Sequence, residues 1–136
     1  MAKVKVKTAF AKASAVKYVD GFVLVVPKKR VAEYKKMASQ GGKIWLKYGA
    51  LSYQECQLDD AKPKWVTFTF PKMIKAKPTE TVWFSYIEYK SKKHRDEVNK
   101  KVMKEMDKQA DKYKNVPMPF DMKRMAYGGF KVIVNS

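Results

Sequence analysis

The chain has 136 residues, a formal net charge of +17 and a hydrophobic fraction of 46%. This length fits one domain with a real core, and the hydrophobic fraction excludes a disordered chain. The apolar runs are no longer than strands, so we expect no transmembrane segment. One cysteine, Cys56, excludes an intrachain disulfide and suits a cytoplasmic location, and one cysteine with one histidine leaves no usual zinc site. We predict neither a metal site nor a cofactor.

The positive charge raises the question of nucleic-acid binding, but its composition argues against it. Only Arg30, Arg95 and Arg124 are arginines among the 30 basic residues. Base contacts and bidentate phosphate contacts favour arginine, whereas scattered lysines are typical of a solubilising surface. A basic nucleic-acid-binding module therefore stays as an alternative. Residues 1–16 contain no acidic residue and predict a basic N-terminal arm, with a short edge strand over residues 3–7 as the alternative; a single domain is predicted over residues 17–136.

The first half of the domain predicts alternating strands and one helix. Residues 17–26 are rich in valine and aromatics and predict a strand. An apolar stripe over residues 31–48 predicts a helix. Gly41 and Gly42 interrupt it, so we expect a kink or a close packing contact there. Residues 50–60 predict a second strand. The strict alternation of residues 65–70 predicts a further short strand.

The second half repeats this pattern. Residues 81–90 predict a strand that is apolar on both faces. Ser91 is a suitable N-cap for a second helix, whose apolar stripe reaches Tyr113. After a loop with two prolines, residues 125–134 predict the last strand, with Val132–Val134 as a buried segment.

This element order predicts an α+β protein with a ferredoxin-like βαββαβ sandwich and an antiparallel sheet. Two helices cover only one face of such a sheet. Residues 22–26 and 81–90 are nevertheless apolar on both faces. Because monomers rarely expose so large an apolar patch, we expect a second copy of the chain to cover the other face. The sequence therefore predicts a homodimer.

Several segments also carry a resemblance to a known family. They are "YVDGFVLVVP", "KYGALSYQEC", "KAKPTETVWFSYIEY", "SKKHRDEVNKKVM" and "MPFDMKRMAYGGF". Together they resemble the YbaA-like family, a domain of unknown function, over most of residues 17–134. The resemblance implies membership of the dimeric α/β-barrel group, in which ferredoxin-like sheets pair back to back. It implies no established reaction and no catalytic residues.

Charged residues near the second helix are the first candidates for a site. His94, Arg95 and Asp96 lie close together in its opening turn and could serve acid–base chemistry. The alternative is capping and favourable interaction with the helix dipole.

Carboxylates inside predicted strands are the next candidates, because charged residues are usually unwelcome there. Asp20, Glu55 and Glu88 occupy such positions. If Glu88 is interior it needs a partner, for which Arg124 and the tyrosines are candidates. Alternatively, it lies solvated at the strand end. Cys56 could be a nucleophile only if a base or a positive group activated it, so we expect a buried and inert cysteine.

The segment before the last strand is a further candidate, because loops that lead into strands often shape pockets. Arg124 and Tyr127 could meet an anion or a carbonyl group, or an Asp121–Arg124 pair could fix the loop against the dimer partner. The predicted ligand-binding residues are Trp83, Tyr86, Glu88, His94, Arg95, Asp121, Arg124 and Tyr127. They predict a small-molecule-binding protein or an enzyme, with a pocket between sheet and helices. A nucleic-acid-binding module or a purely structural interaction protein are the alternatives.

Glycines in two of the predicted strands mark close approaches of other groups. Gly21 lies in the first strand, and Gly128 and Gly129 lie in the last. A glycine inside a strand usually marks a bulge or the close approach of a backbone or a ligand. We expect a helix, the partner subunit or a ligand to come close at these positions.

Overall fold

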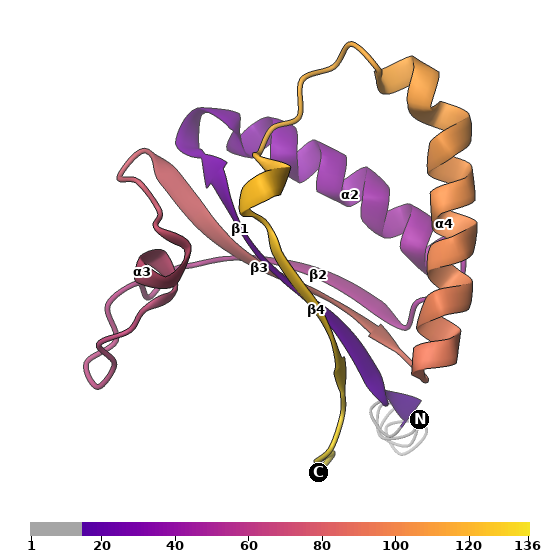
Figure 1. Cartoon of the computed structure of the whole chain (residues 1–136), viewed down its shortest axis with the longest axis horizontal. Coiled ribbons are helices and arrows are strands. Elements are labelled where there is room, and N and C mark those ends of the chain that lie inside the picture. Colours follow the sequence, from indigo (N-terminus) through magenta and orange to yellow (C-terminus); the bar gives the residue numbers. More distant parts are fainter. Residues whose placement is uncertain (1–14) are drawn as a thin grey trace, which may run out of the picture.

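A computed structural model describes residues 15–136 of the chain, and its main elements are four strands and three helices. In chain order they are β1 (Tyr18–Pro27), α2 (Val31–Lys47), β2 (Ser52–Gln57), α3 (Phe70–Ile74), β3 (Glu80–Tyr89), α4 (Lys92–Tyr113) and β4 (Ala126–Lys131), as Figure 1 shows. Two short 3₁₀ helices, η1 (Lys28–Arg30) and η2 (Met122–Arg124), precede α2 and β4. All but two residues of the predicted basic arm lie outside the described range.

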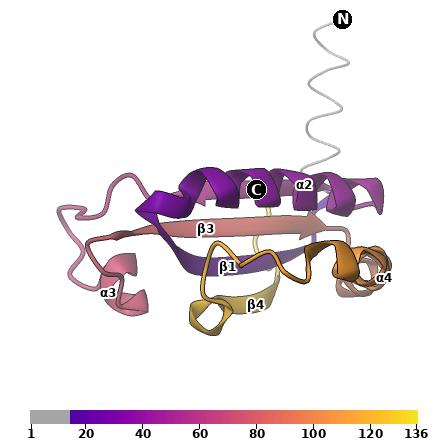
Figure 2. The ribbon, with the colours of Figure 1, turned by 90° about the horizontal axis from the view of Figure 1, so that it is seen from above.

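The four strands form one sheet in the order β2-β3-β1-β4, and every neighbouring pair is antiparallel. The predicted α+β class and antiparallel sheet are confirmed, and the strand order is compatible with a ferredoxin-like layout. Helix α2 covers one face, while the short helix α3 lies on the opposite side of the sheet (Figure 2). Within the described range, no helix combines the length and the apolar character needed to cross a membrane.

The core lies between the sheet and the two long helices. Leu24 and Val26 of β1 pack with Tyr34 and Ala38 of α2. A second group of buried residues joins the end of the sheet to α4 and includes Tyr18, Ile87, Tyr89, Val98 and Val102. The apolar stripe predicted for α2 therefore packs on the sheet, as does that of α4 from Val98 to Met106, whereas its predicted end at Tyr113 is exposed.

The beginning of α4 agrees with the sequence. The Ser91 hydroxyl oxygen accepts a hydrogen bond from the His94 backbone N–H at 3.0 Å, as its predicted role of N-cap requires. His94 Nδ1 in turn accepts a hydrogen bond from the Lys90 backbone N–H at 3.0 Å. These two bonds fix the direction in which the chain leaves β3.

The glycine pair inside α2 serves close packing. The helix runs unbroken from Val31 to Lys47. A Cβ atom on Gly42 would lie 2.8 Å from Cδ1 of Tyr53, whereas one on Gly41 would have its nearest contact at 3.7 Å. Of the two expected explanations, a close contact is found at Gly42, because any side chain there would collide with a ring on β2.

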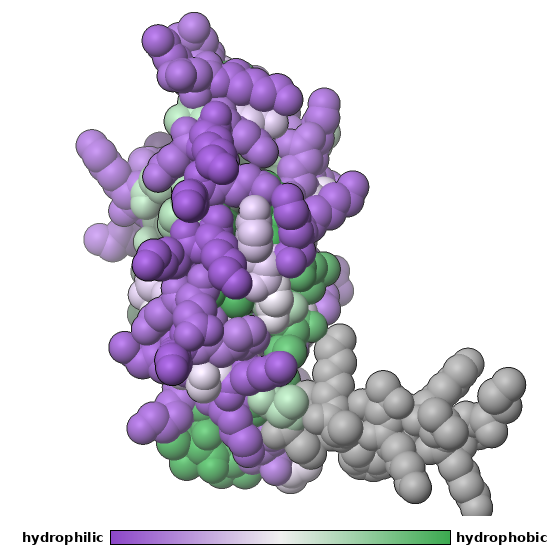
Figure 3. Space-filling model, turned by 90° about the vertical axis from the view of Figure 1, so that its right-hand side faces the viewer, coloured by the Kyte–Doolittle hydropathy of each residue, from purple (hydrophilic) through white to green (hydrophobic). Residues whose placement is uncertain are grey.

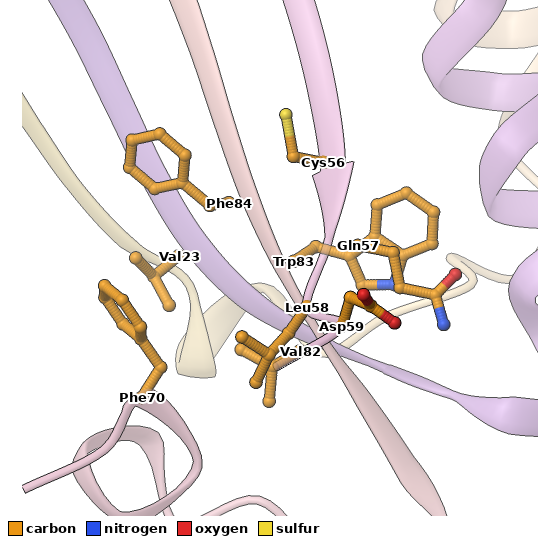
Figure 4. A pocket seen from close by; sticks show the side chains of 9 residues that line it. All are labelled: Val23, Cys56, Gln57, Leu58, Asp59, Phe70, Val82, Trp83 and Phe84. Carbon is orange, nitrogen blue, oxygen red and sulfur yellow. The ribbon is translucent and has the colours of Figure 1, made fainter. Parts of the chain in front are cut away.

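The face of the sheet away from α2 is only partly covered. Phe84 of β3 is 44% exposed and Phe130 of β4 is 61% exposed on this open face. A hollow beside α3 has an apolar wall in which Phe70 rises toward Val23, with Phe84 beyond it (Figure 4). The predicted second apolar face is therefore present, and α3 covers one end of it.

The strand predicted over residues 65–70 is wrong. This segment is irregular until α3 begins at Phe70, and the Thr69 side chain caps that helix. Trp65 is 89% exposed. The alternation of residue types is correct for a strand, but the segment does not pair with the free edge of β2, which in the described chain is bonded only to β3.

The buried segment predicted over Val132–Val134 is also wrong. Strand β4 ends at Lys131, which lies opposite Tyr18, the first residue of β1. The Val132 N–H still bonds to the Lys17 carbonyl oxygen at 3.0 Å, but Ile133 is 80% exposed. The chain continues past the end of its partner strand, where Val132 is half-buried and Val134 is exposed like Ile133.

Candidate functional site

A groove runs between helix α2 and the edge strand β2. Its volume is about 510 Å³, which falls within the usual range of small-molecule sites. Its polar lining residues are Lys35, Ser39, Lys43, Tyr53, Glu55 and Gln57, and Trp83 contributes an aromatic surface.

Helix α2 forms one wall of this groove through two rows of residues with helical spacing. Ala38 and Gly42 are four residues apart and buried, and their small size lets the helix approach β2 closely. Lys35 and Lys43 lie eight residues apart along the same wall. The sequence therefore places small residues at the base of this wall and cations above them.

Glu55 is the central polar group of the groove. Its Oε1 accepts hydrogen bonds from the hydroxyls of Tyr34, at 2.6 Å, and Ser85. Its Oε2 accepts one from the Tyr53 hydroxyl at 2.7 Å. Burial, together with the neighbouring Glu55 carboxylate, raises the pKa of both tyrosines well above the usual value, so both stay protonated donors at neutral pH. Three hydroxyls thus converge on one carboxylate.

A second carboxylate with several partners lies near the other edge of the sheet, and this one is fully buried. Asp20 is 1% exposed, and its Oδ1 accepts hydrogen bonds from Arg95 Nη1 at 2.7 Å and from the Tyr127 hydroxyl at 3.0 Å. Arg95 Nη1 also donates to the Tyr127 oxygen at 2.6 Å. Burial, and then the hydrogen bond to Asp20, raises the pKa of Tyr127 to about 12. This triad ties α4 to β1 and β4.

The strand glycines lie beside this triad. A Cβ atom on Gly129 would lie 2.3 Å from the Tyr18 hydroxyl oxygen and 3.0 Å from Arg95 Nη1, so side chains of β1 and α4 make the close approach there. Gly21 and Gly128 pair directly on the open face, where the Phe130 ring lies 3.4 and 3.3 Å from their would-be Cβ atoms. Side chains of the chain itself therefore occupy the space that these glycines leave.

The predicted site residues do not form one pocket. Trp83 lines the α2–β2 groove, and Arg95 meets Tyr127 in the triad. Glu88 lies on the open face, paired with Ser52, whose hydroxyl donates to Glu88 Oε1 at 2.5 Å. Tyr86 lies on the same face as Glu88, two residues earlier on β3.

Arg124 links η2 to the start of β3 and the end of α3. Its Nη1 forms an ion pair with Glu80 at 2.5 Å, and its Nη2 donates to the carbonyl oxygens of Ile74 and Lys75. The prediction that Arg124 could pair with Glu88 is therefore wrong. The Asp121–Arg124 ion pair is also not formed, because the Asp121 carboxylate caps η2 through the Lys123 N–H instead. His94 likewise contributes to the start of α4.

The prediction of a buried cysteine is wrong. Cys56 is free and exposed, because its side chain lies opposite Phe84 on the uncovered face of an edge strand. The three hydroxyl donors to Glu55 were not predicted either. A carboxylate inside a strand drew attention to Glu55, but nothing local in the sequence connects it to Tyr34 or Ser85.

The basic surface shows mixed charge where α4 faces solvent. That side of the molecule is covered with hydrophilic side chains (Figure 3). Lysines there alternate with acids, and Lys47 of α2 pairs with Glu105 of α4 at 2.7 Å. Acids among the lysines oppose the phosphate contacts that a nucleic-acid interface needs.

These features define an α+β domain with an open antiparallel sheet and a polar groove beneath its first long helix. The chain belongs to the family described as "Protein of unknown function (DUF1428)", which matches residues 17–122. It is 42% identical over 119 residues to the "Uncharacterized protein YbaA" of Escherichia coli (strain K12), a match that covers 88% of this chain and 98% of the relative. Proteins of the same description from Escherichia coli O157:H7 and Shigella flexneri match equally. The resemblance to the YbaA-like family is confirmed.

Proposed function

We propose that the protein is a homodimeric small-molecule-binding protein or enzyme, with the α2–β2 groove of each protomer as its binding site. The observation that carries this proposal is the Glu55 carboxylate, held by three hydroxyls in a groove of about 510 Å³. Ligand sites combine apolar walls with a few fixed polar groups, and Trp83 and Leu46 supply apolar surface here. A cytoplasmic location belongs to the same proposal, supported by the free thiol of Cys56.

The hydrogen bonds around Glu55 support a binding role because they fix the carboxylate in advance. Two contacts hold Tyr53 in place: its ring packs against the Trp45 ring at a centroid distance of 5.9 Å, and its hydroxyl donates to Glu55. A polar group that is already oriented loses little entropy when a ligand arrives.

The homodimer rests on the open face of the sheet. Exposed Phe84 and Phe130 and half-buried Tyr86 form an aromatic strip across it. A second copy related by two-fold symmetry would bury this strip against its own equivalent. In this arrangement two ferredoxin-like sheets pair face to face as a dimeric α/β barrel, while the α2–β2 grooves stay outside the interface.

The groove is tested by a fragment screen on the ¹⁵N-labelled protein. Ligands are expected to shift the amide resonances of Gly42, Tyr53 and Glu55. Ser39→Trp should abolish these shifts by filling the groove, whereas Gln40→Trp is a matched control at an exposed position of α2 outside the groove lining. The groove proposal fails if no fragment moves the groove amides, or if shifts persist in the Ser39 variant.

The dimer is tested by native mass spectrometry, which should find twice the 15.8 kDa mass of one chain. Phe84→Glu should give monomers, because it places a charge within the aromatic strip. Tyr113→Glu is the control, since Tyr113 is a similarly exposed aromatic on α4. A wild-type monomer at micromolar concentration would refute the dimer.

A further inference from the structure

The two walls of the α2–β2 groove carry opposite charges that are not paired with each other. Glu55 lies on the β2 wall, and Lys35 and Lys43 lie on the α2 wall. Among residues 15–136, none of the ion pairs includes any of these three side chains. Both the negative and the positive charges of the groove are thus available to a ligand.

Glu55 is half-buried and has hydroxyl groups, not a cation, as its partners. Asp20 and Glu80 each pair with an arginine, and Glu105 pairs with a lysine. Glu55 is held instead by three neutral hydroxyls. A carboxylate offers about four lone-pair positions, so one position on Oε2 remains for a further donor. A ligand ammonium would fill it and neutralise a half-buried charge, which is otherwise costly.

The α2 wall offers a complementary site for an anion. Lys35 and Lys43 are separated by about 12 Å along the helix axis, from the rise of about 1.5 Å per residue. Ser39 lies midway between them and adds a hydroxyl donor. Both lysine side chains are exposed and long enough to turn toward a group bound between them.

We propose that the groove binds a small zwitterion, whose ammonium group contacts Glu55 and whose carboxylate or similar anion contacts the α2 lysines. The short chain between the two charges lies against Leu46, Tyr53 and Trp83. This inference rests on the proposed function, because it names the class of ligand for the same groove. A lone cation would meet repulsion from the lysines, and a lone anion would meet repulsion from Glu55.

Three probes of matched length test the inference on the full chain by NMR titration. The first, 5-aminopentanoate, carries both an ammonium and a carboxylate. Pentylamine carries only the ammonium, and pentanoate carries only the carboxylate. We expect 5-aminopentanoate to bind at least tenfold more tightly than either of the others. Equal affinity of all three would overturn the inference.

Two variants assign the charges to their walls. Glu55→Gln keeps an oxygen acceptor for the hydroxyls, and it should weaken 5-aminopentanoate at least tenfold while leaving pentanoate no weaker. Lys35→Met with Lys43→Met alters only exposed side chains, so it remains informative if the Glu55 variant does not fold. It should weaken 5-aminopentanoate and pentanoate but not pentylamine. Unchanged zwitterion affinity in this folded double variant would also overturn the inference.

The outcomes separate the class of ligand from the existence of the site. If pentylamine or pentanoate shifts the groove amides as strongly as 5-aminopentanoate does, the zwitterion inference fails and the binding groove stands. If neither these probes nor the fragment screen shifts the groove amides, both the inference and the proposed function fail.

Discussion

Replacing Gly42 with alanine adds one methyl group at the point where α2 crosses Tyr53. The new Cβ atom would lie 2.8 Å from Cδ1 and 3.1 Å from Cε1 of that ring. The ring cannot move away freely, because its hydroxyl bonds to Glu55 at 2.7 Å and Trp45 packs against it. The helix or the ring must therefore shift, and the packing of the groove wall is disturbed.

The neighbouring glycine provides a control with the same chemistry. Alanine at Gly41 would have its nearest contact at 3.7 Å, an ordinary van der Waals distance. Alanine favours a helix over glycine by about 1 kcal/mol, and overpacking costs about 1–3 kcal/mol. Gly41→Ala should therefore raise the free energy of unfolding by about 1 kcal/mol. Gly42→Ala should be about 1–3 kcal/mol less stable than Gly41→Ala. Both variants gain the same helix preference of alanine, so the difference between them is the cost of overpacking against Tyr53.

Urea unfolding followed by circular dichroism measures this difference. All variants must be compared at one protein concentration, because dimerisation would contribute to the apparent stability. If both variants gain the same stability within error, Gly42 is not required by packing against Tyr53, and the account of the groove wall is wrong.

Three further predictions concern the ion pairs and their neighbours. Arg95→Met should lower the free energy of unfolding by about 3–5 kcal/mol, because Asp20 is left buried without a cation, and urea unfolding should show this loss. The pKa of Tyr127 is raised from the ordinary value of 10.0 to about 12, so its contribution to stability is complete below pH 10 and is lost as the pH rises to 12. Melting temperatures of the wild type should fall more steeply across this interval than those of Tyr127→Phe, and parallel curves would contradict the assignment. Arg124→Ala should cost about 1–3 kcal/mol through the loss of its bond to Glu80, while native mass spectrometry finds the same mass as for the wild type; a lower mass would contradict a role confined to one chain.

The strands and helices could be predicted because each depends on a local pattern. Residues close together in the sequence determine the apolar stripe of α2, the cap at Ser91 and the bulky strand over residues 81–90. Strand pairing is not local, since a segment with strand-like alternation becomes a strand only where it bonds to a neighbour. Residues 65–70 have the alternation but do not pair with the free edge of β2, and Val132–Val134 extend past the first residue of β1.

The candidate site could be predicted only in part, for the same reason. Side-chain alternation identifies Glu55 as a carboxylate within a strand. Its donors Tyr34 and Ser85 lie 21 residues before and 30 residues after it in the sequence. Their meeting depends on the register of β2 against β3 and on the closeness of α2. Arg95 and Tyr127 were both predicted as site residues, but their shared contact with Asp20 depends on the sheet order.

The end of β4 has a consequence for how copies of the chain meet one another. In the described sheet β4 is an edge strand, and its sequence continues as the β-prone run Val132–Val134, of which Ile133 and Val134 are exposed. Lys131 is the single charged residue between Arg124 and Ser136. A charge on an edge strand opposes strand-to-strand aggregation, so Lys131 acts as a gatekeeper. Lys131→Val should lower the concentration at which light scattering detects aggregates, and unchanged scattering would show that other features protect this edge.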